Sequence, residues 1–454
     1  MHASSLSAAD QAKQFLDKYP QVDTIEMILA DINGVHRGKW LPRESLVNAL
    51  QGSIKLPITT LCLDIWGRDV YELVFESGDA DGLCLPVADS LALVPWAERP
   101  AAQMLVSMAN LDGTPFAGDP RVVLQQVCDR YRGLGLRPVV AIELEFHLLQ
   151  QPRAADGSPA HTGNQAERPL GGETYSLDLM EKYAAVFHEM RDAAALLGVA
   201  VDTLIKEGGP SQYEINLNHT DDPLVAADQA LMLKRLIKKV AQKHDLVASF
   251  MAKPFADSAG NGMHVHFSLL NDAGANVYDN GSEAGSATLR HAIAGLADTM
   301  PDCMAIFAPN QNSYRRLQPG NHAPLSPCWG YENRTVALRV PAGDTSAMRI
   351  EHRVAGADAN AYLTLAAILA GAYVGITEKR AAPEPTVGDA YSTHKPSLPA
   401  FWPEALRRFD ASRFIAQQLN PTLQKMYSAS KWQELNQFNN TVTSMEYDAY
   451  LNTV

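Results

Sequence analysis

Two glutamates, Glu143 and Glu145, lie two residues apart in the otherwise apolar run AIELEFHLL, residues 141 to 149. The run predicts a buried strand, and side chains in a strand alternate between its two faces. The apolar residues would therefore share one face, and the two glutamates and His147 would share the other. Two carboxylates this close raise each other's pKa or require a cation between them. The spacing thus points to a cation site on this strand.

Three further stretches, KEGGPSQYEINLN, GNGMHVHFSL and MRIEHRV, carry polar side chains at alternate positions of predicted strands. The polar residues of each strand are Glu214, Asn216 and Asn218, with Glu207 just before the turn; His264, His266 and Ser268; and Arg349, Glu351 and Arg353. Each pattern alone is more typical of a solvated strand face, a filler histidine or a cross-strand salt bridge. Four such strands in one chain favour a shared site instead.

Five of the candidate ligands are glutamates and one is a histidine: Glu143, Glu145, Glu207, Glu214, His264 and Glu351. Carboxylate-rich sites suit Mg²⁺ or Mn²⁺, whereas zinc prefers more histidine and cysteine. Six ligands suffice for two ions that keep open positions for a substrate phosphate and water.

Several arginines supply the complementary charge. NSYRRLQPG contains Arg315 and Arg316, YENRTVALRVP contains Arg334 and Arg339, and Arg349 and Arg353 follow. Guanidinium groups recognise carboxylates and phosphates through paired hydrogen bonds. Metal ligands together with arginines indicate phosphoryl transfer. The stretch GVHRGK is one residue short of a P-loop and is followed by Trp40, so it predicts no such loop.

Composition narrows the class of protein. The 454 residues carry a net charge of −13, which argues against nucleic acid or an anionic membrane as the main partner. The five cysteines form no CxxC pair, so we expect buried thiols in a reducing compartment. The longest uncharged apolar run, residues 361 to 376, is shorter than the roughly 20 residues of a membrane helix. We interpret it as a buried helix capped by Asp358 or Asn360 and expect a cytoplasmic protein.

The sequence pattern divides the chain into two parts. Residues 21 to 110 alternate short β-like runs, including TLCLDIWG and YELVFESGDADGLCLP, with turns, and Asn33-Gly34 predicts a hairpin. The turn-rich stretch DGTPFAGDP is a credible boundary. Further expected elements are a short N-terminal helix ending near Pro20, helices over 120 to 132, over 176 to 197 and from Asp222-Pro223, strands at FMAKPF and MHVHFSL, and a loop over 380 to 400.

These stretches together resemble the glutamine synthetase family over nearly the whole chain. IELEF, KEGGPSQYEINLN, AKPFADSAGNGMHVHFSL, NSYRRLQPG, ENRTVALRVP and RIEHRV stand in the family's order and spacing. The resemblance implies an α+β fold, with a β-grasp-like domain over 1–117 and a catalytic domain over 118–454 that has a curved antiparallel sheet and helices. It implies rings of six subunits, often stacked in pairs, with active sites between subunits. Members phosphorylate the γ-carboxylate of glutamate with ATP and then let an amine attack the acyl phosphate.

The resemblance also implies residue roles. One ion, Mg²⁺ or Mn²⁺, would be held by Glu145, Glu207 and Glu214, and a second by Glu143, His264 and Glu351. Glutamate would contact Gly260, His264, Arg316 and Arg353. The nucleotide would contact His266, Ser268, Arg334, Arg339 and Arg349. The groups acting on the reacting phosphate would be Arg334, Arg339 and Glu351.

Two departures from the family bear on the amine. Ammonium-using members carry a Glu in the loop where this chain reads LQPGNHAP, with His322 at the acidic position, and an Asp-Gly-Ser-Ser loop that is not found here. Losing both acids predicts an organic primary amine, as in the glutamate–polyamine ligase branch, which DINGVHRGKW and EYDAYL also resemble. His322 would then line the amine pocket, and a classical glutamine synthetase using ammonium is the alternative.

The class of amine stays open at this point. Putrescine or a longer polyamine, entering polyamine catabolism, would need an acid for its far ammonium, and Asp64 is one candidate. A monoamine would suit apolar residues such as Pro57, Ile58, Trp66 or Trp329. Two other classes fit less well. A metal-dependent amidohydrolase should carry its His-x-His near the chain start, and a non-catalytic relative should have lost metal ligands.

Overall fold

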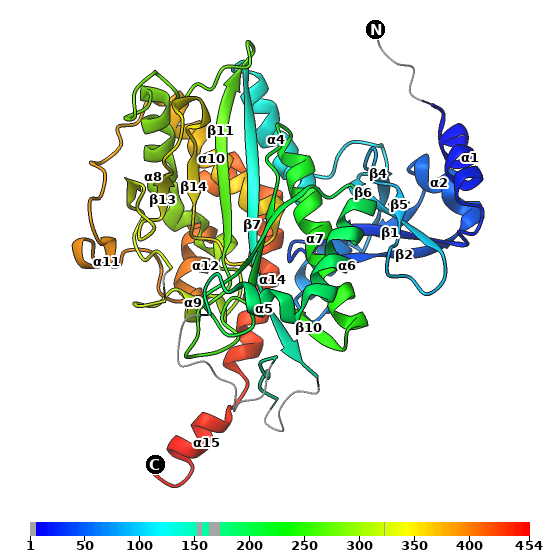
Figure 1. Cartoon of the computed structure of the whole chain (residues 1–454). Helices are drawn as coiled ribbons and strands as arrows, with labels where there is room; N and C mark the ends of the chain where they lie inside the picture. The colour runs from blue at the N-terminus through cyan, green and yellow to red at the C-terminus, as the bar shows by residue number, and fades with distance from the viewer. Residues whose placement is uncertain (1–5, 152–156, 163–172, 322) are drawn as a thin grey trace.

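The computed structural model describes residues 6–151, 157–162, 173–321 and 323–454. Its elements form two sheets with helices packed around them, which makes the fold α+β as expected (Figure 1). The smaller sheet lies to the right in Figure 1, and the larger sheet lies at the centre and left. No helix among the described residues is long and apolar enough to cross a membrane.

The smaller sheet has six strands in the order β2-β1-β6-β4-β3, with β5 paired to β6. Strands β1 and β6 run parallel, and the other pairs are antiparallel. The predicted hairpin is confirmed, because β1 pairs with β2 and Gly34 takes a φ of 70° in the turn. The elements of this part are α1 (Ala8–Lys18), β1 (Thr24–Ala30), β2 (His36–Pro42), α2 (Leu46–Leu50), β3 (Lys55–Pro57), α3 (Tyr71–Ser77), β4 (Asp81–Pro86), β5 (Ala92–Leu93) and β6 (Ala101–Ala109).

One β-like run of this part is wrong as a strand prediction, and a second is wrong in its first half, whereas its second half, DGLCLP, forms β4 as expected. TLCLDIWG contributes to a 3₁₀ helix, Ile58–Cys62, and then turns. The turn forms because the carboxylate of Asp64 accepts the backbone N–H groups of Trp66 and Arg68, which offers the backbone an alternative to a sheet ladder. YELVFES forms helix α3, which ends where Gly78 adopts the left-handed conformation.

The larger sheet has eight strands in the order β12-β13-β14-β11-β7-β9-β8, with β10 paired to β7. All of its pairs are antiparallel except β12 with β13. The strands are β7 (Leu136–Gln150), β8 (Val201–Lys206), β9 (Gln212–Leu217), β10 (Leu246–Ser249), β11 (Met263–Asn271), β12 (Trp329–Tyr331), β13 (Leu338–Val340) and β14 (Ile350–His352). The long strand β7 contains the opening glutamates at its middle.

Helices cover the apolar face of this sheet. The alternate apolar residues of β7 are buried, as predicted, with Leu144 and Phe146 fully inaccessible. Burying each such side chain contributes about 1.5–3 kcal/mol. The helices that contact its strands include α4 (Pro120–Arg132), α6 (Ala184–Leu196) and α7 (Pro223–Lys243). Behind them, α10 (Ala361–Thr377) packs on α4, α7 and α8 (Ala287–Phe307).

The helix starts follow from capping residues. Asp119 and Asp222 accept backbone N–H groups at the starts of α4 and α7, each with proline in the first turn. Asn360 caps α10, and its amide also donates to the carbonyl of Asp31 in the smaller part. The 17 residues of α10 are almost entirely buried, which confirms the predicted internal helix. The five cysteines are buried free thiols, also as expected.

Two further predictions are corrected. The helix expected over 176–197 is broken at Tyr183 into α5 (Leu177–Lys182) and α6. FMAKPF is not a strand, because the side chain of Asn312 pairs with both backbone groups of Lys253 in place of a ladder. The remaining helices are α9 (Ser313–Arg316), α11 (Ala390–Thr393), α12 (Trp402–Ala411), α13 (Arg413–Gln418), α14 (Pro421–Asn439) and α15 (Ser444–Tyr450), with α11 inside the predicted 380–400 loop.

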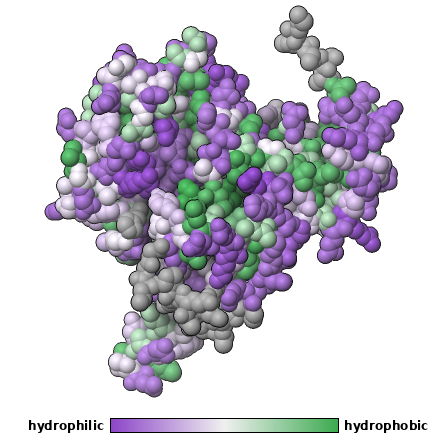
Figure 2. All heavy atoms as spheres, in the orientation of Figure 1, coloured by the Kyte–Doolittle hydropathy of each residue, from purple (hydrophilic) through white to green (hydrophobic). Residues whose placement is uncertain are grey.

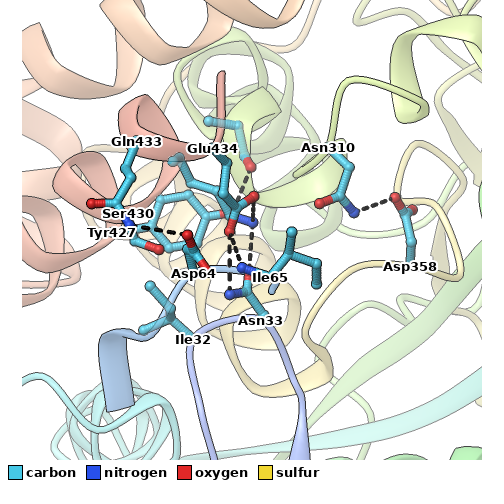
Figure 3. A network of polar contacts seen from close by, with 12 residues as sticks. Ile32, Asn33, Asp64, Ile65, Asn310, Asp358, Tyr427, Ser430, Gln433 and Glu434 are labelled. Carbon is cyan, nitrogen blue, oxygen red and sulfur yellow. Dashed lines mark hydrogen bonds and ion pairs between the residues drawn. The ribbon is translucent and has the colours of Figure 1, made fainter. Parts of the chain in front are cut away.

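A buried polar cluster fastens α14 to the smaller part (Figure 3). Lys431 and Glu434 are fully buried and form an ion pair at 3.0 Å. Glu434 accepts the backbone N–H of Ile65 at 2.8 Å, and Lys431 donates to the side chain of Asn33.

All strands of the smaller sheet precede residue 110 and α4 starts at Pro120. We propose on this ground that a β-grasp-like domain ends at residue 117 and the catalytic domain begins at 118.

Candidate active site

The register of the larger sheet brings the predicted ligands together. On β7, Glu143 lies opposite His264 of β11 and Asn216 of β9, and Glu145 lies opposite Glu214 of β9. On β14, Glu351 lies opposite His266 of β11 and Arg339 of β13. Hydrophilic side chains gather over β13 and β14 on this face of the molecule (Figure 2). Five neighbouring strands thus contribute to one polar surface.

Glu143 is the centre of the cluster. Its two carboxylate oxygens lie 3.1 Å from Nδ1 of His264 and 2.8 Å from Nε2 of His266. Ligand atoms of Glu143, His266 and Glu351 lie within 4.8 Å of one another, and so do those of Glu143, Glu214 and His264. Nδ1 of His264 also lies 3.8 Å from Glu351. Either triplet could hold a metal ion.

The glutamates on the β7–β9 side of the site repel one another when no cation lies between them. Burial, then the charges of Glu143, Glu145 and Glu207, raise the pKa of Glu214 to about 9. Burial and the charge of Glu145 likewise raise the pKa of Glu207. A divalent cation between these carboxylates would relieve both effects. The donor set of carboxylate oxygens with one imidazole fits a hard ion such as Mg²⁺ or Mn²⁺.

Arginines neutralise the opposite side of the cluster. Arg339 donates to one oxygen of Glu351 at 2.9 Å, and Arg353 donates to the other oxygen. Burial alone would raise the pKa of Glu351, but Arg353 and the two histidines hold it below its usual range. The buried Nε–H groups of Arg339 and Arg353 have no partner among the described residues. Two buried donors without acceptors fit an anionic substrate.

A third arginine, Arg316, lies beneath this surface. It is buried and donates to the carbonyl oxygens of Val354 and Arg353 at 2.8 and 3.4 Å. Two glycines make room for it. A Cβ on Gly260 would lie 2.9 Å from Cγ of Arg316, and one on Gly262 would lie 3.0 Å from both Arg316 and the ring of His264. Glycine is therefore needed at both positions for this close packing.

The other predicted site residues lie further out. Nε of Arg349 approaches Nδ1 of His266 at 3.3 Å, and Ser268 follows on the same face of β11. Arg334 is exposed beside Glu332, so the structure does not bring it into the cluster. His322 lies outside the described residues.

Two of the residues considered for the amine, Asp64 and Trp329, already have hydrogen-bond partners within the chain. The carboxylate of Asp64 accepts from Arg68 at 2.8 Å and from Gln433 at 3.0 Å, besides its two backbone contacts. It therefore has no oxygen left for a polyamine's far ammonium. Trp329 is buried and its indole donates to the carbonyl of Pro383. Trp66 remains exposed beside Phe438, with ring centroids 5.5 Å apart.

Gln212 is a site residue that sequence reasoning missed. Its buried amide donates to Glu145 at 3.2 Å, to the carbonyl of Gly260 at 3.0 Å and to the side chain of Asn261 at 3.2 Å. It therefore connects a metal ligand to the loop that carries Gly260. The available signal was its position two residues before Glu214, on the same face of the strand. Glutamine is rarely a metal ligand, so this position did not single it out.

A family comparison agrees with this arrangement. The family model described as "Glutamine synthetase, catalytic domain" matches residues 117–450. The chain belongs to the glutamine synthetase family. As a member of that family it is a relative of enzymes that use different amines. It is 40% identical to the "Gamma-glutamylputrescine synthetase PuuA" of Escherichia coli K12, over 96% of this chain and 93% of that protein.

Two other similarities extend over almost the full chain. The "Glutamate--isopropylamine ligase" of a Pseudomonas species is 33% identical over 98% of both proteins. The solved structure titled "GmaS/ADP complex-Conformation 1" superposes with a TM-score of 0.84 at 26% identity, covering 99% of this chain and all of that one. This member of the glutamine synthetase family thus resembles two named glutamate–amine ligases in sequence and the GmaS/ADP structure in fold.

Proposed function

We propose that the protein is an ATP-dependent ligase that joins the γ-carboxylate of glutamate to a primary organic amine through γ-glutamyl phosphate. The observation that carries this proposal is the pairing of Glu143, Glu145, Glu214, His264 and Glu351 on one sheet face, where Arg339 and Arg353 bind Glu351. The relatives named for putrescine and isopropylamine support an organic amine over ammonium.

The reaction follows from elementary chemistry. A carboxylate and an amine only exchange a proton, so the carboxylate must first gain a leaving group. The γ-phosphoryl group of ATP is transferred to the carboxylate oxygen, and ADP is the leaving group. The amine nitrogen then attacks the acyl carbon, phosphate departs with the bonding electrons, and the nitrogen gives up a proton to form the amide. Bound divalent ions would neutralise the charge of the transferred phosphoryl group. We propose that Glu145, Glu207 and Glu214 hold one ion and Glu143, His264 and Glu351 the other.

The arginines would divide the substrates among themselves. Arg316 and Arg353, with Gly260 and His264, would orient glutamate, since a guanidinium pairs with a carboxylate in a fixed geometry. Arg334 and Arg339 would contact the phosphates, and His266, Ser268 and Arg349 would line the nucleotide site. Glu351 would act with both arginines at the reacting phosphate. Arg334 is exposed, so its contact with the phosphates requires that bound ATP extends to it.

We propose a diamine such as putrescine as the amine, on the strength of the 40% identical relative. The far ammonium would need an acid other than Asp64. A homo-oligomeric ring with sites between subunits would supply such a group from a neighbour. In Figure 1 the smaller sheet lies across the molecule from β13 and β14, which carry Arg339 and Glu351 of the site.

ATP- and glutamate-dependent phosphate release in Mg²⁺ tests the function. The amines would be ammonium, putrescine, spermidine, isopropylamine and benzylamine, with each amide identified by mass. We expect putrescine to give the highest kcat/KM. Isopropylamine or benzylamine as best substrate would move the protein to the monoamine class. Preference for ammonium would overturn the proposal in favour of a classical glutamine synthetase.

A further inference from the structure

A cavity lies between the smaller sheet and α7, on the side of α7 away from the site described above. Its volume is about 180 Å³. Its walls come from β1, β5, β6, the turn after α6, and α7. Most of the lining is apolar, including Ile28, Leu105 and Val199. None of the proposed metal, glutamate or nucleotide ligands lines it.

One polar side chain in this cavity has no partner. Gln103 of β6 is 2% exposed, and neither its Nε2 nor its Oε1 has a hydrogen-bond partner among the described residues. Leaving a buried amide unpaired costs free energy that a protein normally avoids, so each case calls for an explanation. Both faces of a central strand are buried here, and an apolar residue of similar size would be the ordinary choice.

The register of the sheet shows where Gln103 points. It is the direct partner of Glu26 in the parallel β1–β6 pair, so both side chains leave the sheet on the same side. Glu26 forms an ion pair with Arg235 of α7. Gln103 therefore faces α7, across the cavity from Asp228, Gln229 and Met232 of that helix.

The other polar groups around the cavity are occupied or lie at its mouth. Asp228 accepts both donors of the Arg121 fork at 3.0 Å and the hydroxyl of Tyr362 at 2.6 Å. The hydroxyl of Ser90 is bonded to the backbone of Val87 and Leu105. Asp89 is exposed at the rim. Gln229 is half-buried, and its amide donates to the carbonyl of Gly198 at 3.4 Å. Gln103 is thus the fully buried side chain of the lining whose amide has neither a donor nor an acceptor partner among the described residues.

We propose that this cavity binds a small neutral molecule that ends in a primary carboxamide and carries a short aliphatic body. A primary carboxamide presents an N–H and a C=O on the same edge and can form two antiparallel hydrogen bonds with the amide of Gln103. A carboxylate offers only acceptors, so it would leave the acceptor oxygen of Gln103 unpaired. An ammonium offers only donors, and burying it among apolar walls is costly.

Butyramide is the probe, with butyrate and butylamine as matched controls of the same chain length. Saturation-transfer NMR and calorimetry on the full-length protein would measure binding. We expect butyramide alone to bind, and Gln103→Met, which keeps the side-chain volume, to weaken its binding at least tenfold. Ligase activity without butyramide should stay unchanged in Gln103→Met. The variant Arg316→Met should still bind butyramide, because its change lies at the other site.

A second variant tests the same cavity independently, in case Gln103→Met does not fold. Val225→Trp places a large side chain at the mouth of the cavity from the surface of α7 and should also abolish butyramide binding. Equal binding of butyramide to the wild type and to Gln103→Met would overturn the proposal. So would binding of butyrate or butylamine as tight as that of butyramide, or no binding of butyramide to the wild type, which would leave the cavity to water. None of these outcomes depends on which amine the ligase uses.

Discussion

His264 and Glu143 lie directly opposite each other on β11 and β7, with Nδ1 of the histidine 3.1 Å from the carboxylate. His266, one step along the same face, binds the second oxygen. Burial raises the pKa of Glu143, but the hydrogen bonds from the two histidines outweigh it and hold the carboxyl well below its usual range. Glu143 is therefore ionised and oriented before any cation arrives.

Replacing Glu143 by Gln should disable the site while keeping its shape. The amide removes the charge on which the two ligand triplets converge. We expect Mn²⁺ affinity to fall at least about 100-fold, since even outer partners of metal ligands are worth 10–100-fold. Mn²⁺ titration by electron paramagnetic resonance would measure this. Glu98→Gln, at an exposed position of the smaller part, is the control and should match the wild type.

Gln212→Met tests whether the buried amide positions the site. Its loss frees Glu145 and the Gly260 loop, so we expect metal affinity to fall about 10–100-fold and KM for glutamate to rise. The effect on kcat at saturating metal and glutamate should be smaller than the effect on KM. An unchanged KM with a reduced melting temperature would instead mean that Gln212 only stabilises the fold.

The ion pair of Lys431 and Glu434 predicts a non-additive pair of substitutions. Lys431→Met leaves a buried carboxylate unpaired, and removing one partner of a buried pair costs about 3–5 kcal/mol. Glu434→Gln should cost less, because the amide can still accept the N–H of Ile65. The double variant should be more stable than Lys431→Met alone. Thermal unfolding of all four proteins gives the cycle, and strict additivity would contradict the coupling.

Lys234 predicts a pH-dependent stability. The residue as a whole is half-buried, but desolvation of its ammonium, then the charge of Lys238, lower its pKa to about 7. Between about pH 7 and the unfolded value near 10.4, the unfolded state binds more protons, so this lysine's penalty shrinks as pH rises. Lys234→Met should therefore stabilise the protein by a few kcal/mol near pH 7. The loss of the hydrogen bond from Lys234 to the carbonyl of Ala359 reduces this gain. The gain should also become smaller as the pH rises toward 10.

Melting temperatures of the wild type and Lys234→Met from pH 6 to 10 would check this. Lys13→Met, on the polar helix α1, serves as the control and should show no pH-dependent difference. A stability difference between wild type and Lys234→Met that is constant with pH would contradict the lowered pKa.

Much of the larger sheet could be predicted because its signals are local. Alternating residues gave the buried and polar faces of β7, β9 and β11, and Asp119, Asp222 and Asn360 marked helix starts. The failures have distant causes. Asn312 intercepts the backbone of Lys253 from 59 residues away. The role of Gln212 depends on which loop the fold brings beside it, and a single glutamine gives no indication of that.

The metal-ligand candidates lie opposite one another on neighbouring strands, so the number of residues in each strand decides which of them meet. Inserting or deleting one residue in β7 between Glu143 and Glu145 would turn one of these carboxylates into the apolar core. We expect lineages of this enzyme to exchange, lengthen and shorten loops freely while the strands admit substitution but no change of length. New amine specificities would then arise at the loop ends of an unchanged phosphoryl-transfer core.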